Sequence, residues 1–241
     1  MSNSSNVFLS AEWLHLVFLN YSLDAALLTP FVPRGTTLDS FDGNIYVSLV
    51  GFLFLKTKMF GKFAVPFHSA FEEANLRFYV RREVDGEVRR GVVFIKEIVP
   101  KPAIAFTARF FYGEKYVSLP MAHKIASASD ATELEYRWKH RGQWSRLVAS
   151  ASVAPQLPAQ GSLQQYITEH YWGYSRQRSG RTIEYRVLHT PWLVRTASEA
   201  RFEGDVAALY GPEFASVLSK PPDSAHIAEG SGVEVLRGAT I

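Results

Sequence analysis

Two long segments joined by an Asp-Gly turn constrain the fold of this chain more than any other part of its sequence. From Glu73 to Tyr79 polar and apolar side chains alternate within the segment 71–79, and residues 77–84 and 87–99 flank Asp85-Gly86. This dipeptide between two such runs is the strongest short-range signal for a β-hairpin. The sequence therefore predicts two antiparallel strands connected by a two-residue loop.

The first of these strands carries an ordered set of polar side chains on one face. Successive side chains of a strand point to opposite faces, so the alternating apolar residues form a core face. The other face carries four polar residues, which are Glu73, Asn75, Arg77 and Tyr79. A carboxylate, an amide, a guanidinium and a phenol in register make this face the best candidate site in the sequence.

The turn also predicts which residues of the second strand face this patch. With a two-residue loop, Asn75 pairs with Lys96. Lys96 then joins the polar face, diagonal to Glu73 and Arg77 and within reach of long side chains. A β-bulge would change this register, and Glu97 is the one polar residue expected on the apolar face. The acid, guanidinium and amine form either a functional site or a buried cluster that neutralises itself.

Arginines gather at the tip of the same hairpin. The register places like charges opposite one another in two pairs, which are Arg81 with Arg90 and Arg82 with Arg89. Such pairs are unfavourable unless they are solvated or bound to an anion, so a solvated tip and a partner-binding surface are both open. No stacking aromatic residues are interleaved with these arginines, and nucleic acid is therefore not an expected partner.

Composition indicates a globular protein with a substantial core. Of the 241 residues, 47% are hydrophobic, which is ample for one large β-rich domain. The absence of cysteine removes disulfides, thiolate nucleophiles and sulfur-ligated metals. The polar N-terminus lacks a secretory signal, and the longest apolar run, residues 45–55, is too short for a membrane-spanning helix. We expect a cytoplasmic protein without a membrane partner, with a disordered tail at 1–10 and a single domain at 11–241.

The remaining elements predict an α+β fold with a large antiparallel, barrel-like sheet. Further strands are expected at residues 12–21, 38–41, 44–55, 117–126, 132–139, 144–154, 182–188, 192–203 and 233–236. Helices are expected at residues 24–31, 102–112, 162–174, 205–210 and 212–219. No repeat, linker or low-complexity segment divides the chain.

Two of these helices carry candidate ligand-binding residues. Arg109 is the sole charge within the apolar helix at 102–112, so a dedicated anionic partner is expected. Glu169 and His170 are adjacent on the helix at 162–174, where neighbours point about 100° apart and do not face each other. His170 is either a hydrogen-bonded core histidine or a ligand contact. Nucleotide loops, nucleophile elbows and metal-binding histidine motifs are missing from the sequence, so neither a cofactor nor a metal site is expected.

Five motifs give the chain a family resemblance. They read, in order, FDGNIYVSLV, FEEANLRFYV, RGVVFIKEIVPK, ITEHYWGY and VLHTPW. From about Trp13 to the C-terminus the chain resembles the YqjF-like family, domain of unknown function 2071, which has no assigned activity. That family is similar in fold to acetoacetate decarboxylase. The resemblance implies a cone-shaped β-barrel with flanking helices and a central cavity.

The resemblance also implies a mechanism from which this chain departs. In acetoacetate decarboxylase a Schiff-base lysine follows a helix and a glycine-containing segment. Gly113 matches that glycine, which puts Tyr116 in the place of the lysine. Lys115 lies one residue early, beside Glu114, whose carboxylate stabilises the charged amine. Glu73 matches the region of an active-site glutamate, so we expect a cavity that lacks the catalytic lysine, with Glu114 and Tyr116 as ligand-binding candidates.

Two functions from different classes follow. The first is a small-molecule enzyme that acts on a carbonyl or carboxylate compound, with Glu73 as acid/base, Arg77 as anion clamp and Lys96 as the available amine. The second is a non-catalytic protein that binds an apolar or anionic ligand in the same cavity. A small molecule is the expected partner in both, and a homo-oligomer is compatible with either.

Overall fold

The computed structural model describes residues 6–59, 63–64, 70–102, 115–128 and 131–241. Most of the helix expected at residues 102–112, with Arg109, lies outside these ranges, and so does Glu114. The roles expected of these two residues therefore stay predictions. None of the described helices is long and apolar enough to cross a membrane.

Strands make up most of the described chain, and the helices are short. The strands of the first half are β1 (Val7–Leu23), β2 (Thr37–Leu38), β3 (Ile45–Met59), β4 (Phe63–Ala64), β5 (Ala70–Val84), β6 (Glu87–Val99) and β7 (Tyr116–Ser118). Those of the second half are β8 (Met121–Ser127), β9 (Thr132–His140), β10 (Gln143–Ala151), β11 (Trp172–Arg176), β12 (Thr182–His189), β13 (Val194–Thr196), β14 (Glu199–Glu203), β15 (Ser224–Leu236) and β16 (Ala239–Thr240). The helical segments are α1 (Ala25–Leu28), η1 (Thr29–Phe31), α3 (Leu163–Thr168), α4 (Val206–Tyr210), η2 (Pro212–Phe214) and α5 (Ala215–Leu218).

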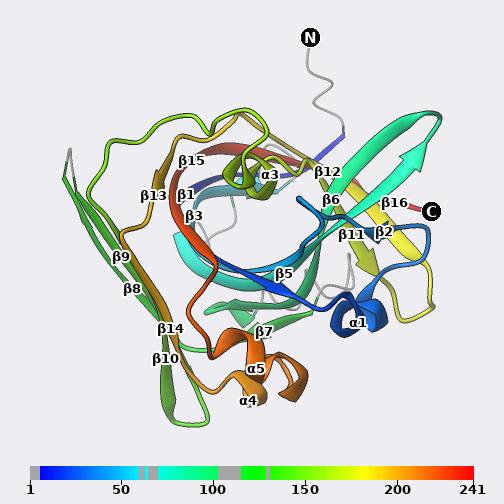
Figure 1. Ribbon diagram of the computed structural model, residues 1–241. Helices are drawn as coiled ribbons and strands as arrows, with labels where there is room; N and C mark the ends of the chain where they lie inside the picture. Colours follow the sequence, from blue (N-terminus) through cyan, green and yellow to red (C-terminus); the bar gives the residue numbers. More distant parts are fainter. Residues whose placement is uncertain (1–5, 60–62, 65–69, 103–114, 129–130) are drawn as a thin grey trace.

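The long strands belong to one strongly curved sheet. Their order is β15-β1-β3-β5-β6-β11-β12. β12 pairs with β15 as well as with β11, so this order returns to the strand on which it began. Figure 1 shows the strands curving around one axis, with α3 inside their outline. The concave face of the sheet therefore collects the side chains that point inward.

A second sheet, with the strand order β14-β10-β9-β8, packs outside the first (Figure 1). Tyr136 and Leu147 of this sheet lie against Gly51 of β3, where a Cβ atom would come within 2.8 Å of the Tyr136 ring. The Tyr136 hydroxyl also donates a hydrogen bond to the His15 carbonyl at 2.7 Å. The hydrophobic core therefore has two layers, one inside the curved sheet and one between the sheets.

The β5–β6 hairpin forms around Asp85-Gly86, as the sequence predicts. Asp85 and Gly86 both have positive φ, of 52° and 82°, which the tight turn requires. From the turn as far as Arg77, which pairs with Phe94, the register is the expected one. The prediction of the hairpin and of this part of its register is confirmed.

Beyond Arg77 a β-bulge shifts the register of the hairpin. Leu76 pairs with Lys96, and Asn75 pairs with Glu97. The predicted pairing of Asn75 with Lys96 is therefore wrong. The cause is one additional residue in β6, since Ile95 has no partner of its own and packs into the core layer between the sheets. A bulge of this kind changes the face to which the following residues point.

The arginines at the hairpin tip are balanced by carboxylates of the chain itself. The two expected pairs form, which are Arg81 with Arg90 and Arg82 with Arg89. Glu184 of β12 accepts hydrogen bonds from Arg82 at 2.8 Å and from Arg89 at 2.6 Å. Arg90 Nε lies 3.3 Å from a carboxylate oxygen of Asp39. An external anion is therefore not needed to explain three of these four arginines.

The helix expected at residues 162–174 is much shorter than predicted. Ser162 caps its start as expected, but α3 ends at Thr168 and strand β11 follows. Within β11, Gly173 lies against the Tyr185 ring so closely that no Cβ atom would fit there. Pairing of β11 with β12 and β6 thus overrides the helical spacing of the apolar residues.

Further boundaries also differ from the predictions, and the strand expected at 117–126 is divided into β7 and β8, which belong to different sheets. β1 begins at Val7, so residues 7–10, which were expected in a disordered tail, include residues paired with β15. The strand expected at 192–203 is divided into β13 and β14, which belong to different sheets. β15 has 13 residues, whereas a strand was expected only at 233–236. The prediction was too short because glycines within β15 weaken the strand pattern.

One of these glycines is required by the fold. Gly230 has φ of 88°, and a Cβ atom there would overlap the Trp13 carbonyl oxygen. We expect Gly230→Ala to lower the free energy of unfolding by at least about 2 kcal/mol, because backbone conformation and overlap both oppose the side chain. Gly232→Ala is the matched control, since no atom of the described residues lies within 4 Å of its Cβ position, and it should change stability by about 0.5 kcal/mol or less. Urea denaturation measures both, and equal effects would contradict this account of the strand.

Candidate functional site

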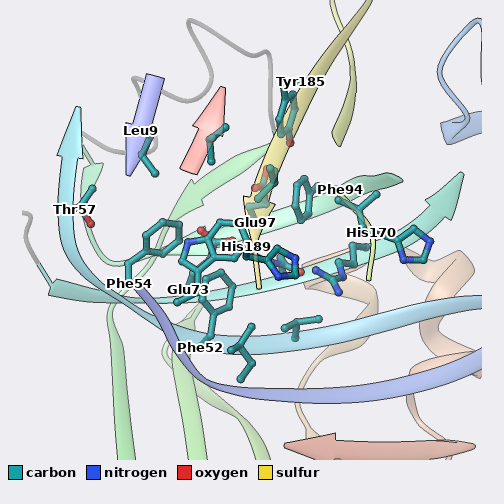
Figure 2. A pocket seen from close by; sticks show the side chains of 18 of the residues that line it. Leu9, Phe52, Phe54, Thr57, Glu73, Phe94, Glu97, His170, Tyr185 and His189 are labelled. Carbon is teal, nitrogen blue, oxygen red and sulfur yellow. Dashed lines mark hydrogen bonds between the residues drawn. The ribbon is translucent and has the colours of Figure 1, made fainter. Parts of the chain in front are cut away.

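A cavity of about 210 Å³ lies on the concave side of the curved sheet. Its walls come from β1, β3, β5, β6, β7, β11, β12 and β15 and from the chain after α3. Three of the four residues of the expected polar face line it, which are Glu73, Asn75 and Arg77. In Figure 2, Glu73 and Glu97 lie towards the middle, Phe54 and Thr57 towards one end, and His170 at the other.

Glu73 is a buried carboxyl group held by two hydrogen bonds. The residue is 2% exposed. Asn75 Nδ2 donates to Oε1 and the Tyr116 hydroxyl donates to Oε2, each at 3.0 Å. Burial raises the pKa of Glu73 from 4.5 to about 7, although the two hydrogen bonds and the nearby charge of Arg77 favour the carboxylate. Near neutral pH this carboxyl group can therefore either give or take a proton.

Arg77 is a buried cation at the other end of the polar face. One guanidinium nitrogen, Nη2, donates a hydrogen bond to the Ile167 carbonyl at 3.1 Å. The guanidinium carbon lies 5.1 Å from the centre of the Phe18 ring and 5.7 Å from that of Tyr79. In the described part of the chain it forms no ion pair within 4.0 Å, and its Nε has no hydrogen-bond partner. A buried charge of this kind is costly unless paired, and this guanidinium has the charge and the free donor that an anion would require.

Because of the β-bulge, a carboxyl group lines the cavity in place of the expected amine. Lys96 does not line the cavity but donates a hydrogen bond from Nζ to the Leu209 carbonyl on the other side of the sheet. Partial burial lowers the pKa of Lys96. Glu97, which is 2% exposed, lines the cavity instead. The sequence contained the signal for this exchange, because Glu97 was the single polar residue on a predicted apolar face.

His170 stands at the end of the cavity near Arg77. Its ring centre lies 4.6 Å from that of Tyr79 and 5.0 Å from that of Tyr166. Nε2 is 3.8 Å from an Asp39 oxygen, and neither ring nitrogen has a hydrogen-bond partner in the described residues. Burial lowers the pKa of His170, and the Arg77 charge acts in the same direction while Asp39 opposes it. The ring is thus a neutral group. It is buried, as a core histidine would be, and it also lines the cavity, as a ligand contact would.

His189 is a second histidine of the cavity, and it was not among the site residues predicted from the sequence. Its ring stacks on Trp192 with 4.2 Å between centres. Nδ1 lies 2.8 Å from the Thr190 carbonyl oxygen. Burial lowers the pKa of His189. Among the described residues, no three His, Asp or Glu side chains gather into a group that could hold a metal ion.

Two other predicted site residues do not line the cavity. Tyr79 is fully buried, and its hydroxyl lies 2.6 Å from Ser48 Oγ, which in turn donates to Asn20. Glu169 is the C-terminal cap of α3 and accepts a hydrogen bond from Gln165 Nε2 at 3.3 Å. Neither side chain is among the cavity walls.

Tyr116 is the first residue of β7, and its side chain and that of the preceding Lys115 lie in different surroundings. Tyr116 lines the cavity and hydrogen-bonds to Glu73. The Lys115 ammonium lies 4.8 Å from the centre of the Phe31 ring, and no lysine occurs among the described cavity walls.

Aromatic side chains form the opposite end of the cavity. Trp13 packs edge-on against Phe52 and Phe54, with ring centres 5.5 and 5.6 Å apart. Phe54 stacks on Phe71 at 4.7 Å. We call these four residues the aromatic wall. Thr57 lies at the same end, 4% exposed, and its hydroxyl has no hydrogen-bond partner in the described residues. The sequence did not predict this wall, because its members come from three strands that meet only in the folded sheet.

The pKa of Glu73 makes stability depend on pH. The folded chain keeps the proton on Glu73 up to about pH 7, whereas the unfolded chain releases it near 4.5. The folded state thus binds more protons between these values, and its stability falls as pH rises through them. We expect Glu73→Gln to be more stable than the natural protein at pH 8, by up to about 3 kcal/mol, and similar to it at pH 4.

Urea unfolding between pH 4 and pH 8 measures this difference. Glu133→Gln is the matched control, because Glu133 is an exposed carboxylate of β9 that does not line the cavity. Glu72 also points away from the cavity but pairs with His123, whose Nδ1 lies 2.7 Å away. The Glu133→Gln control should keep the pH dependence of the natural protein. A stability difference for Glu73→Gln that is the same at every pH would show that the carboxyl group has no raised pKa.

Solved structures with the same fold are acetoacetate decarboxylase-like. An acetoacetate decarboxylase-like enzyme from Sphingomonas wittichii RW1 aligns with a TM-score of 0.66 and 13% identity, covering 99% of this chain and 94% of that one. The enduracididine biosynthesis enzyme MppR complexed with pyruvate also gives 0.66 and 13% identity, covering 98% and 90%. At such identities the likeness shows the fold alone, and it confirms the acetoacetate decarboxylase-like fold that the family resemblance implied.

Sequence comparison identifies the family. The chain is 25% identical to the uncharacterized protein YqjF of Bacillus subtilis (strain 168) over 186 residues, which are 77% of this chain and 74% of that relative. The model of the family DUF2071, described as "Uncharacterized conserved protein", matches residues 10–232. Since this match contains all five sequence motifs and nearly the whole chain, the protein belongs to the DUF2071 family.

Proposed function

We propose that the protein is an enzyme that transfers protons to and from a small carbonyl or carboxylate compound inside a barrel-like sheet. In this proposal Glu73 is the general acid/base and Arg77 binds the anionic group. The observation that carries it is a buried carboxyl group, with a pKa of about 7, in the same cavity as a buried guanidinium that has no ion pair among the described residues.

The chemistry of Glu73 supports the catalytic role. A general acid/base works best when its pKa is close to the working pH, and burial brings this carboxyl group there. The hydrogen bonds from Asn75 and Tyr116 hold it in one orientation. A group that only filled a core would not need a carboxyl at this cost, and perturbed pKa values in a cavity are typical of functional sites.

The positions of the lysines argue against an amine mechanism. Lys96 bonds to a carbonyl on the far side of β6, and Lys115 lies beside Phe31. Tyr116, in the place that the resemblance gives to a Schiff-base lysine, supplies a hydrogen bond to Glu73 instead. The fold neighbours still support a small carbonyl or carboxylate ligand, since one of them is described as complexed with pyruvate.

The second candidate is a protein that binds a ligand without changing it. The aromatic wall would serve binding as well as catalysis, and so would the polar atoms that have no hydrogen-bond partner among the described residues, such as Arg77 Nε and Asn75 Oδ1. Binding of a compound without proton exchange would favour this candidate.

Hydrogen–deuterium exchange at carbon tests the enzyme proposal. The protein is incubated in D2O with small 2-oxo and 3-oxo acids, and loss of the proton next to the carbonyl is followed by NMR. We expect Glu73→Gln to slow exchange at least about 100-fold while the acid still binds. Glu72→Gln should exchange at the natural rate. Exchange that is unaffected by Glu73→Gln would overturn the assignment of Glu73.

Borohydride reduction separates this proposal from amine catalysis. With the same acids present, we expect mass spectrometry to find no stoichiometric adduct on any lysine, because no lysine lines the described part of the cavity. A specific adduct on Lys96 would instead require the β6 bulge to rearrange and would restore a Schiff-base mechanism.

A further inference from the structure

We infer that the ligand is an elongated monocarboxylate, with its carboxylate at Arg77 and an apolar tail against the aromatic wall formed by Trp13, Phe52, Phe54 and Phe71. This inference rests on the proposed function for the location of the site, but it concerns the identity of the molecule and not the reaction.

The cavity groups lie in order along one strand. Phe71, Glu73, Asn75 and Arg77 follow each other on the inner face of β5. At a strand rise of about 3.3 Å per residue, the Cα atoms of Phe71 and Arg77 are at most about 20 Å apart in this curved strand. Figure 2 shows the same order, with Phe54 at one end, Glu73 further in and His170 at the other end. A ligand that contacts both ends must therefore be long.

The apolar end is built for a hydrophobic group. Pairing of β3 with β5 sets Phe54 opposite Phe71 and Phe52 opposite Glu73, so the wall begins beside the acid. Phe52, Phe54 and Phe71 are each 4 to 6% exposed, and the three side chains all face the cavity. Covering such rings with a chain or a ring of the ligand removes apolar surface from water.

Charge limits the ligand to one carboxylate. Arg77 is the only arginine or lysine among the described residues that line the cavity, while Glu73 and Glu97 supply carboxyl groups nearer its middle. A second carboxylate on the ligand would meet no cation among the described residues of the aromatic wall, and burying it there would be costly. A dicarboxylate of equal length should thus bind more weakly.

Volume limits the width of the ligand. An apolar cavity of about 150 Å³ holds one benzene molecule, and this cavity has about 210 Å³ distributed over its length. Such a space admits an unbranched chain or a single ring with a short arm. Nucleotides and coenzyme A thioesters are too large.

A chain-length series tests the inference by calorimetry on the full chain. The probes are saturated straight-chain monocarboxylates from acetate to dodecanoate, together with the corresponding α,ω-dicarboxylates. Once the tail reaches the wall, we expect Kd to fall by about fourfold for each added methylene group and then to level off when the wall is covered. Affinity that does not change with length, or dicarboxylates that bind as tightly as monocarboxylates, would overturn it.

Variants assign the two ends of the site. Phe54→Ala should weaken the binding of long acids at least tenfold and leave the binding of short acids unchanged. If the alanine variant does not fold, Phe54→Leu repeats the test. Arg77→Met should weaken every acid by a similar factor. Val88→Ala is the control for loss of apolar surface, because Val88 is 50% exposed on the hairpin, and it should change nothing. Equal loss for short and long acids in the Phe54 variants would contradict the tail assignment.

The outcomes separate this inference from the proposed function. If chain length does not affect binding but Glu73→Gln still abolishes proton exchange, the enzyme proposal stands and the ligand class is wrong. If affinity follows chain length but no 2-oxo or 3-oxo acid exchanges its protons, the ligand class is supported and the protein binds a ligand without changing it.

Discussion

The extra residue in β6 decides the chemistry of the cavity. Without the bulge, Lys96 would face Glu73 and Arg77, and an amine mechanism would be available. With it, Ile95 enters the core between the sheets, Lys96 turns towards Leu209, and Glu97 faces the cavity. One inserted backbone unit thus replaces an amine by a second carboxyl group, which is why the proposed mechanism transfers protons and forms no covalent bond with a lysine.

Arginines in two settings show how the fold distinguishes structural from available charge. At the hairpin tip, Arg82 and Arg89 share the carboxylate of Glu184, and Arg90 lies near Asp39. Arg77 is more deeply buried, yet its direct contacts in the described chain are a carbonyl group and two aromatic rings. The arginine side chains paired with carboxylates lie at the partly exposed tip, whereas the buried Arg77 keeps an Nε without a hydrogen-bond partner among the described residues, and the proposal of an anionic ligand rests on this difference.

Local patterns in the sequence were sufficient for the hairpin, its turn and the polar face with Glu73, Asn75 and Arg77. They failed where distant contacts decide. The helical spacing after Ser162 gives way to strand β11 because Gly173 packs on Tyr185, and the alternation in β6 does not reveal a bulge. The aromatic wall is a further case: each of its strands shows only ordinary alternation, and the cluster exists because the curved sheet brings three strands to one end of the cavity.

The second sheet packs against the outer side of the strands whose inner side lines the cavity. Gly51 belongs to β3 between Val50 and Phe52, which face the cavity, and its bare outer side is covered by Tyr136 and Leu147 of the second sheet. At this point β3 alone separates the cavity from the second sheet, and the Tyr136 ring packs against the outer side of β3. Substitutions of Tyr136 in β9 or Leu147 in β10 would shift the backbone of β3 next to Phe52, so residues that do not line the cavity can alter its shape.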